Sequence, residues 1–538
     1  MSAGNGIATE IDGGPMPVNP RFGTEPQVCG LDRRWPVPPN VRVTNLSFND
    51  FAEREPAGIA IHDTRGRRWS RGELYTLINQ TARALGAAGF RSGDAIAIVS
   101  PNCAEYLAVY LAAIQAGLFI VPVNWHLAKP EQDFIIEDSG AKAIFAHERL
   151  LASRLAELAA RASRGTLLIG IGEAPGYVPL PRFIAGQSAK PCAYRATGRA
   201  MSYTSATTGK PKAVLLERNC AESARQRIVE FHRSVGIEPG GHNVHMCTSM
   251  LYHAAPLERA VTALHMGHAL VLVDRWDPVQ ALELIDAHRV TTSFMVPSMF
   301  VRLLKLPAET RARYSTSSLK FVSHSAAPCP IGVKRKMIQW WGPIIWEGYG
   351  ATEGQGTFVG SEEWLRFPGT VGRPIPGSEI RIMDDDGGTL PPGEVGSVYL
   401  TRFTQDRFEY RNDPEATRAC HHGEFFTVGD LGYMNEEGYL FLCDRRTDLI
   451  ISSGMNIYPA EIEQVLVEHP AVADCAVIRI PHELLGQVPN AVIEPALNVE
   501  THAALTADIL LWLASRLSAA KLPHSIEYTN ALPRDPNG

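Results

Sequence analysis

From Ser47 onward, helical apolar patterns alternate along the chain with short runs of Val, Ile and Ala. Residues 72–85 and 106–116 have helical spacing, whereas residues 95–99 and 119–123 are short apolar runs. Such runs are typical of parallel strands whose sheet is covered by helices on both faces. Similar runs recur at residues 269–273, 292–296 and 319–323. We therefore predict an α/β fold with a large, doubly wound N-terminal domain.

The pattern changes in the last third of the chain. Residues 393–444 read as short, turn-rich strand hairpins, which predict a β-rich subdomain. Beyond them, residues 459–468 have the spacing of an amphipathic helix and residues 472–480 that of a strand, so we expect a small, mobile α+β C-terminal domain. The predicted organisation is an N-terminal arm at 1–45, a large domain at 46–444, a hinge at 445–447 and a small domain at 448–538; the motifs described below assign AMP binding and acyl binding to the large domain by resemblance.

Composition limits the class of protein. The 538 residues are 45% hydrophobic and 20% charged, as in ordinary soluble proteins, and the net charge of -6 gives no general nucleic-acid footprint. Nine cysteines without a CxxC pair, and a polar, acidic beginning without a signal peptide, predict a cytoplasmic setting. Residues 107–123 are uncharged, but Gly117 and Pro122 interrupt them, so we expect a buried helix and strand and no membrane span.

The loop at residues 202–214 carries the most specific chemistry. It reads Ser-Tyr-Thr-Ser-Ala-Thr-Thr-Gly-Lys-Pro-Lys-Ala-Val. Hydroxyls, backbone amides and lysine ammoniums are the donors that bind phosphate, although a solvated polar loop has a similar composition. The Walker phosphate loop is a poor match, because Pro211 stands where a hydroxyl residue should follow Gly-Lys.

This loop resembles, almost residue for residue, the signature Tyr-Thr-Ser-Gly-Thr-Thr-Gly-x-Pro-Lys-Gly-Val of the adenylate-forming superfamily, which includes acyl-CoA synthetases, luciferases and peptide-synthetase adenylation domains. The resemblance covers nearly the whole chain after the arm and favours the acyl-CoA ligase branch. Ala206 and Ala213 depart from the pattern, which usually has glycine at both places. The resemblance implies that the loop binds nucleotide through Thr204, Ser205, Thr207, Thr208, Gly209 and Lys212.

Residues 347–353, Glu-Gly-Tyr-Gly-Ala-Thr-Glu, resemble the second signature of the superfamily. The resemblance implies that Tyr349 stacks on adenine, that Thr352 bonds the α-phosphate and that Glu353 holds Mg²⁺. A carboxylate suits a hard cation of this kind. Glu347 and Gly348 belong to the same nucleotide-binding motif, and the glycine spacing does not fit a dinucleotide-binding GxGxxG.

Two further matches complete the nucleotide site. Ala326, Ala327 and Pro328 resemble the turn of small residues on which these enzymes lay adenine, although alone they would be an ordinary turn. Asp430 and Arg445 resemble the ribose clamp, in which the carboxylate accepts hydrogen bonds from both ribose hydroxyls. A lone Asp before a hairpin would more often form a turn.

The remaining matches concern the acid and coenzyme A. His253 resembles the gate beside the acyl carboxylate, whereas taken alone it would be a core histidine. Residues 451–457 resemble the strand that lines the pantetheine tunnel, where Gly454 leaves room for the CoA arm. The resemblance thus assigns catalytic roles to His253, Thr352 and Gly454, and it places Thr447 at the hinge.

The sequence ends at Gly538, and family members carry a catalytic lysine directly after the corresponding Pro-x-Gly. Losing a preorganised donor of this kind typically costs about 10²–10³ in rate, and Lys521 is too far upstream to replace it. Together with Ala206, this predicts a ligase limited to the thioester half-reaction, which takes a preformed acyl-adenylate from a separate adenylating enzyme.

Two alternatives stay open: a complete ATP-dependent acyl-CoA synthetase whose sequence is cut short, and a non-catalytic protein that binds acyl-adenylate. The expected cofactors are coenzyme A and the AMP moiety of the adenylate, with ATP and Mg²⁺ only if adenylation is retained. The expected ligand is a small carboxylic acid or its adenylate. Either an apolar pocket wall or core packing explains Met295, Val296, Pro297, Met299 and Phe300.

Overall fold

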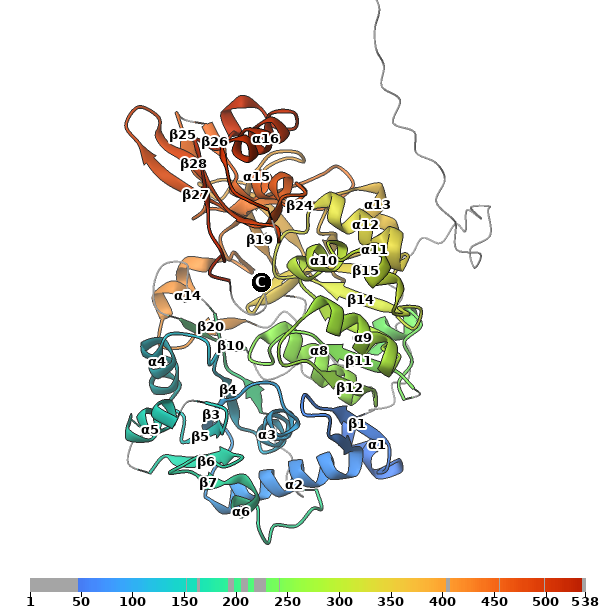
Figure 1. The fold of residues 1–538 in the computed structure, drawn as a ribbon. Helices are drawn as coiled ribbons and strands as arrows, with labels where there is room; N and C mark the ends of the chain where they lie inside the picture. Colours follow the sequence, from blue (N-terminus) through green and yellow to red (C-terminus); the bar gives the residue numbers. More distant parts are fainter. Residues whose placement is uncertain are drawn as a thin grey trace, which may run out of the picture. The chain divides into compact units, whose positions relative to one another are not determined.

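The computed structural model describes residues 47–534 apart from nine short gaps (Figure 1). The gaps are residues 151, 162–164, 192–197, 205–210, 217–228, 241, 403–406, 454 and 498. All elements below belong to one compact unit, residues 37–538.

A six-stranded parallel sheet occupies the first part of the large domain, in the order β7-β6-β5-β3-β4-β8. Its strands are β3 (Ala95–Val99), β4 (Phe119–Pro122), β5 (Ala143–His147), β6 (Leu167–Ile171), β7 (Val178–Pro179) and β8 (Arg199–Ala200). The associated helices are α2 (Arg71–Ala87), α3 (Ala104–Gln115), α4 (Lys129–Ser139), α5 (Ala152–Arg161) and α6 (Leu180–Phe183). Residues 107–123 form most of α3 and then β4, as predicted, and both are almost wholly buried.

A nine-stranded sheet follows, in the order β17-β16-β15-β14-β13-β11-β12-β1-β2. The strands are β1 (Ile59–His62), β2 (Arg68–Ser70), β11 (Val244–Cys247), β12 (Ala269–Leu272), β13 (Thr292–Met295), β14 (Phe321–His324), β15 (Ile345–Ala351), β16 (Gly354–Gly360) and β17 (Arg373–Pro374). Its helices are α1 (Phe48–Arg54), α8 (Ala254–His265), α9 (Pro278–His288), α10 (Pro297–Leu304), α11 (Ala308–Ala312), α12 (Ile331–Trp341) and α13 (Ser361–Arg366). The run from β15 to β1 is parallel, so these strands end at one edge of the sheet.

Two smaller sheets form a β-rich subdomain. The hairpin pattern predicted its strands at residues 393–444 but not those that come earlier in the chain. One sheet holds β9 (Ser202–Thr204), β10 (Lys212–Leu216) and β20 (Phe408–Tyr410). The other holds β18 (Ile380–Met383), β19 (Gly396–Leu400), β21 (His421–His422), β22 (Phe425–Phe426), β23 (Asp430–Met434) and β24 (Leu440–Arg445), and α14 (Pro414–Cys420) lies between β20 and β21 in the chain.

The C-terminal residues form a separate α+β layer with its own core, in which Ile450, Ile462, Leu466, Ile493 and Leu513 are buried together. The elements are β25 (Ile450–Ser452), β26 (Met455–Ile457), α15 (Pro459–Leu466), β27 (Val472–His482), β28 (Gly486–Pro495), α16 (Ala503–Ala514), a 3₁₀ turn (Ala519–Lys521) and β29 (Ser525–Tyr528). The predicted fold class, a large α/β domain with a β-rich subdomain and a small α+β domain, is therefore confirmed.

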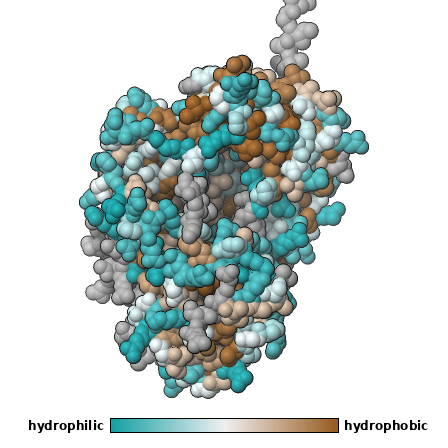
Figure 2. All heavy atoms as spheres, turned by 90° about the vertical axis from the view of Figure 1, so that its left-hand side faces the viewer, coloured by the Kyte–Doolittle hydropathy of each residue, from teal (hydrophilic) through white to brown (hydrophobic). Residues whose placement is uncertain are grey.

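The surface is mostly hydrophilic on the face drawn in Figure 2. In the part of the chain that the structure describes, no helix combines the length and the apolar character needed to cross a bilayer.

Candidate active site

The two ends of the predicted phosphate loop lie side by side. Strands β9 and β10 pair antiparallel with Thr204 opposite Lys212, and the Thr204 hydroxyl donates to the Lys212 carbonyl at 3.4 Å. The Lys212 ammonium lies 3.7 Å from an Asp413 carboxylate oxygen and 5.2 Å from the ring centre of Tyr410. The loop between these two strands lies outside the described residues. It contains Ser205, Thr207, Thr208 and Gly209, which the resemblance assigns to nucleotide binding, and Ala206.

Tyr410 also links Lys212 to the predicted magnesium ligand. Its hydroxyl donates to Glu353 Oε1 at 2.8 Å, and the Arg402 guanidinium donates to the Glu353 backbone carbonyl. Glu353 is only 4% exposed. The candidate phosphate residue Lys212 and the candidate metal ligand Glu353 thus both contact one tyrosine, Lys212 over its ring and Glu353 at its hydroxyl.

Sequence reasoning missed Tyr410, Arg402 and Asp413. Tyr410 reaches the site because β20 pairs with β10, where Tyr410 stands opposite Val214, almost two hundred residues earlier in the chain. The only local signal was Asp413-Pro414, which marks the N-cap of α14 rather than a site.

The proposed ribose clamp is assembled by one antiparallel strand pair. Asp430 and Arg445 are directly opposite each other on β23 and β24, with 3.6 Å between Asp430 Oδ1 and Arg445 Nε. The Tyr349 hydroxyl donates to the other carboxylate oxygen at 2.7 Å. Burial, and then the charge of Asp430, raise the pKa of Tyr349, so this tyrosine stays a neutral donor. The candidate adenine and ribose residues therefore form one connected group.

The second signature forms the end of β15 and the turn into β16, which places Thr352 and Glu353 at the turn. Glycine is needed at Gly350, because a Cβ there would lie 2.7 Å from the Gln355 Cα. At Gly348 a Cβ would lie 3.1 Å from the Phe358 ring.

Glu347 has a different environment from the rest of the signature. Its carboxylate is buried and accepts a hydrogen bond of 2.6 Å from the ammonium of Lys334, which is also buried. His324 Nε2 lies 3.7 Å from the same carboxylate oxygen. Burial raises the pKa of Glu347, while Lys334 opposes this. Its described contacts are thus those of a buried ion pair between β15 and α12.

Three predicted site segments follow parallel strands of one sheet. Ala326, Ala327 and Pro328 come directly after β14, and all three are exposed. Ala326 has a φ of 78°, a left-handed conformation that residues with a side chain rarely adopt. His253 caps the start of α8 after β11, and Thr352 follows β15. In open α/β sheets, ligands bind at this carboxyl edge of the strands.

His253 lies in a row of rings. Its ring centre is 4.6 Å from that of Tyr252, which in turn is 6.2 Å from that of His126. By contrast, Met295, Val296, Met299 and Phe300 are buried in the core cluster of α9, α10 and α12, so core packing accounts for them.

The remaining predicted residues belong to the small domain. Gly454 lies outside the described residues. Lys521 donates to both Glu461 carboxylate oxygens at 2.7 Å, and that it does not replace the catalytic lysine stays a prediction. The described residues hold no group of three or more His, Cys, Asp or Glu suited to a metal. A single carboxylate, Glu353, does suit Mg²⁺, which commonly takes one or two carboxylates and completes its shell with phosphate oxygens.

The mainly parallel sheets with their helices, and the connected side chains of Tyr349, Asp430 and Arg445, place the chain among α/β proteins with a candidate nucleotide site. The family model of the AMP-binding enzymes matches residues 48–403, and the model of the AMP-binding enzyme C-terminal domain matches residues 461–538. The chain belongs to this family of AMP-binding, adenylate-forming enzymes.

Its relatives include acid–CoA ligases. The long-chain-fatty-acid–CoA ligase FadD13 of Mycobacterium tuberculosis is 30% identical over 88% of this chain and 91% of its own length. A feruloyl-CoA synthase from Amycolatopsis is 32% identical over 87% of this chain and 91% of its own length. The o-succinylbenzoate CoA synthetase MenE of Bacillus subtilis, solved with the acyl-adenylate intermediate OSB-AMP, is 26% identical with a TM-score of 0.75, over 92% of this chain and 96% of that one.

Proposed function

We propose that this chain is an ATP-dependent acid–thiol ligase that converts a carboxylic acid into its CoA thioester through an enzyme-bound acyl-adenylate. The observation that carries the proposal is the connected group of Tyr349, Asp430 and Arg445 in a domain that also holds Lys212 and Glu353 on Tyr410. Tyr349, Asp430 and Arg445 supply hydrogen-bond donors and acceptors for ribose. Lys212 supplies a cation for phosphate, and Glu353 supplies a carboxylate for Mg²⁺. The relatives that are named CoA ligases support the acceptor thiol.

In the first half-reaction, an oxygen of the acid's carboxylate bonds to the α-phosphorus of ATP, and pyrophosphate leaves. We assign binding of the acid to the region of His253, and binding of the phosphates to Thr204, Lys212, Thr352 and the loop residues Ser205 to Gly209. Glu353 would hold Mg²⁺, which neutralises phosphate charge when bound. Fixed positive groups at the place where charge develops are the main source of catalysis in such transfers.

In the second half-reaction, the thiol of coenzyme A attacks the carbonyl carbon of the adenylate and AMP leaves with the carboxylate oxygen. Holding the two reactants together supplies most of the rate. We assign the CoA arm to the strand at residues 451–457, with Gly454 as the place where it passes, and Ala326 to Pro328 to the adenine ring.

We also propose that residues 445–447 are the hinge between a domain at 46–444 and a domain at 448–538. The hydrogen bonds support this boundary. The Arg446 amide donates to the Gly429 carbonyl in the large domain at 2.9 Å, whereas the Thr447 carbonyl accepts from Arg479 of β27 at 2.9 Å. The backbone of Arg446 thus bonds to the large domain, whereas the backbone of Thr447, the next residue, bonds to the small domain.

The comparisons give no support to restricting the chain to the thioester half-reaction, since the named ligases match it over about nine-tenths of their length. Ala206 and Gly538, on which that restriction was based, lie outside the described residues. The complete reaction is therefore the proposal, and the half-reaction and the binding protein become outcomes of its test.

The test measures acid-dependent exchange of labelled pyrophosphate into ATP across a panel of carboxylic acids, and separately thioester formation from synthetic acyl-adenylates and CoA. Exchange together with thioester formation is the expected result. Thioester without exchange would show the half-reaction ligase. Binding of acyl-adenylate without either activity would show the sequestering protein.

A further inference from the structure

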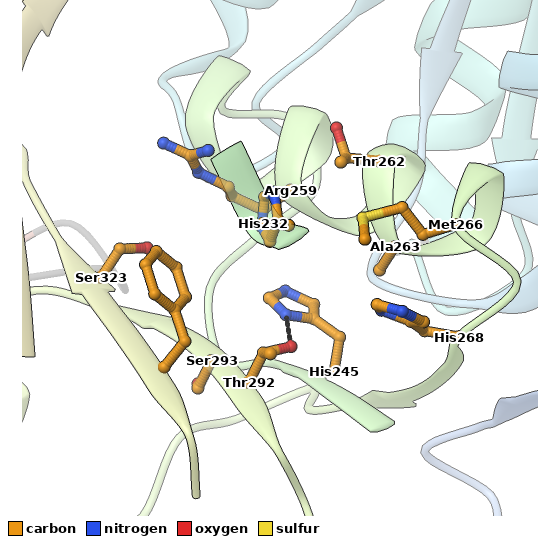
Figure 3. A pocket seen from close by; sticks show the side chains of 11 residues that line it. His232, His245, Arg259, Thr262, Ala263, Met266, His268, Thr292, Ser293 and Ser323 are labelled. Carbon is orange, nitrogen blue, oxygen red and sulfur yellow. Dashed lines mark hydrogen bonds between the residues drawn. The ribbon is translucent and has the colours of Figure 1, made fainter. Parts of the chain in front are cut away.

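A small polar cavity lies between α8 and the strands β11, β13 and β14 (Figure 3). It has room for about one water molecule. His245 Nε2 and the Ser323 hydroxyl belong to its walls and are buried without a hydrogen-bond partner among the described residues. Buried polar atoms of this kind are the usual partners of an internal water, so solvent is enough to account for this cavity.

Two charged side chains, one from each domain, cross the boundary between the large and the small domain. The ammonium of Lys305, at the end of α10, donates to the backbone carbonyls of Val472 and Ala473, to the second at 3.1 Å. In the opposite direction, the carboxylate of Glu468, which follows α15, accepts from the Gly332 amide of the large domain at 3.1 Å. Lys305 with its two carbonyls, and Glu468 with its amide, are called the interdomain clamp below.

Glu468 completes the start of α12. The first amides of a helix have no partner within the helix, and their partial positive charge attracts an anion. Pro330, at the N-cap of α12, supplies no side-chain hydrogen bond. The carboxylate from the small domain takes that place. Gly332 leaves room for it, because a Cβ at Gly332 would overlap the Glu468 carboxylate.

The carbonyls that Lys305 binds lie at an irregularity of β27. The register of β27 on β28 shifts between Val472 and Asp474, which makes Ala473 the extra residue of a β-bulge. Such a residue is left out of the ladder, so its carbonyl can accept from another element. Val467, next to Glu468 in the chain, packs against the core clusters of both domains. An apolar contact therefore accompanies the two charged ones.

The clamp holds the small domain in an arrangement in which the strand proposed for coenzyme A is open to solvent. Ile451 on β25 is 51% exposed and Met455 on β26 is 48% exposed. A site that binds a narrow ligand arm buries most of its apolar lining. Half-exposed apolar side chains on this strand therefore suit the half-reaction that does not use CoA.

We propose that Lys305 and Glu468 are positioning residues for the adenylation half-reaction: they hold the small domain in the clamped arrangement while the acid is adenylated, and their bonds break before the thioester forms. The inference rests on the proposed function for the existence of the two half-reactions. Neither side chain is assigned a contact with a reacting group. Each acts on the population of one arrangement, which a hydrogen bond to a charged group can raise by about tenfold.

The first experiment removes each half of the clamp in the full chain. Lys305→Met removes the ammonium, and Gly332→Ala adds a methyl group that displaces the Glu468 carboxylate without changing any charge. The readout is the rate of pyrophosphate exchange divided by the rate of thioester formation from supplied acyl-adenylate. We expect each variant to lower this ratio by about tenfold. Glu468→Gln keeps an acceptor for the amide and should retain part of the wild-type ratio.

Arg302→Met is the matched control, since Arg302 is an exposed cation of the same helix that packs over Trp276 instead of the small domain. It should keep the wild-type ratio. Thermal unfolding of each variant shows whether it is folded. A ratio that rises or stays unchanged in folded Lys305→Met and Gly332→Ala would overturn the inference while leaving the ligase function intact.

A second measurement needs no activity. Trypsin cleavage after Arg445 or Arg446, in the proposed hinge, is followed by mass spectrometry on the full chain without substrates. Cleavage tracks the population of an opened form, so we expect it to be about tenfold faster in Lys305→Met and Gly332→Ala and unchanged in Arg302→Met. Cleavage at the wild-type rate in both clamp variants would overturn the clamp. Faster cleavage in a protein that supports no exchange with any acid would leave the clamp standing and overturn the proposed function alone.

Discussion

Tyr410 connects the two charged side chains that the proposed function assigns to phosphate and magnesium. Its ring lies under the Lys212 ammonium, and its hydroxyl donates to the Glu353 carboxylate. Groups that hold a metal ligand from behind fix its orientation and its basicity. At the scale of single residues, we therefore expect the proposed site to depend on Tyr410, a side chain outside every recognised motif.

The Tyr410→Phe variant tests this role. It removes the hydroxyl that donates to Glu353 but keeps the ring below Lys212. We expect the Mg²⁺ concentration for half-maximal pyrophosphate exchange to rise about 10-fold to 100-fold. Tyr433→Phe, on a ring that stacks on Phe441, is the matched control and should not change it. An unchanged Mg²⁺ requirement in Tyr410→Phe would contradict the role of the Tyr410 hydroxyl in orienting Glu353 for Mg²⁺.

At the scale of elements, the tight pairing of β15 with β16 holds Thr352 and Glu353 at the edge of the sheet. Gly350 permits this pairing, because the neighbouring backbone leaves no space for a side chain. The turn is thus set by packing between two backbones rather than by the turn residues alone.

Gly350→Ala should destabilise the protein by about 1–3 kcal/mol, since the nearest atom to the new methyl group is the Gln355 Cα and cannot move without shifting the strand. Urea unfolding measures the change. Gly86→Ala is the control: it lies in α2 with nothing near its added methyl group, and should stabilise by up to about 1 kcal/mol. Equal effects of the two substitutions would contradict the packing account.

Local pattern and long-range pairing explain which elements could be predicted. The run at residues 107–123 was readable as a helix and a strand because periodicity and Gly117 are local signals. The contact of Tyr410 with Glu353 was not, because it depends on the pairing of β20 with β10.

The ion pair of Glu347 with Lys334 shows a further limit. The family signature predicts a nucleotide contact for Glu347, which stays a prediction, and the described partners of its carboxylate lie on α12 and β14. The spacing within a motif does not show whether a carboxylate pairs with a buried lysine from a distant helix. That information comes only from tertiary packing.

At the scale of the whole molecule, we propose that the hinge at residues 445–447 changes conformation between the two half-reactions. Thr447→Pro fixes one backbone angle at that point. We expect the ratio of the two half-reaction rates, pyrophosphate exchange and thioester formation from supplied acyl-adenylate, to change by at least about tenfold. Thr447→Ala should leave the ratio unchanged. If Thr447→Pro alters both rates by the same factor, residues 445–447 are not the hinge.

The acyl-adenylate itself can be detected by following oxygen. A carboxylic acid labelled with ¹⁸O in both carboxyl oxygens is incubated with the protein, ATP, Mg²⁺ and CoA, and the AMP is analysed by mass spectrometry. The proposed reaction predicts one ¹⁸O atom in each AMP formed, because the carboxylate oxygen that attacks the α-phosphorus leaves with it, together with one acyl-CoA per AMP. Formation of acyl-CoA with unlabelled AMP, or with ADP and labelled phosphate, would contradict activation through an acyl-adenylate.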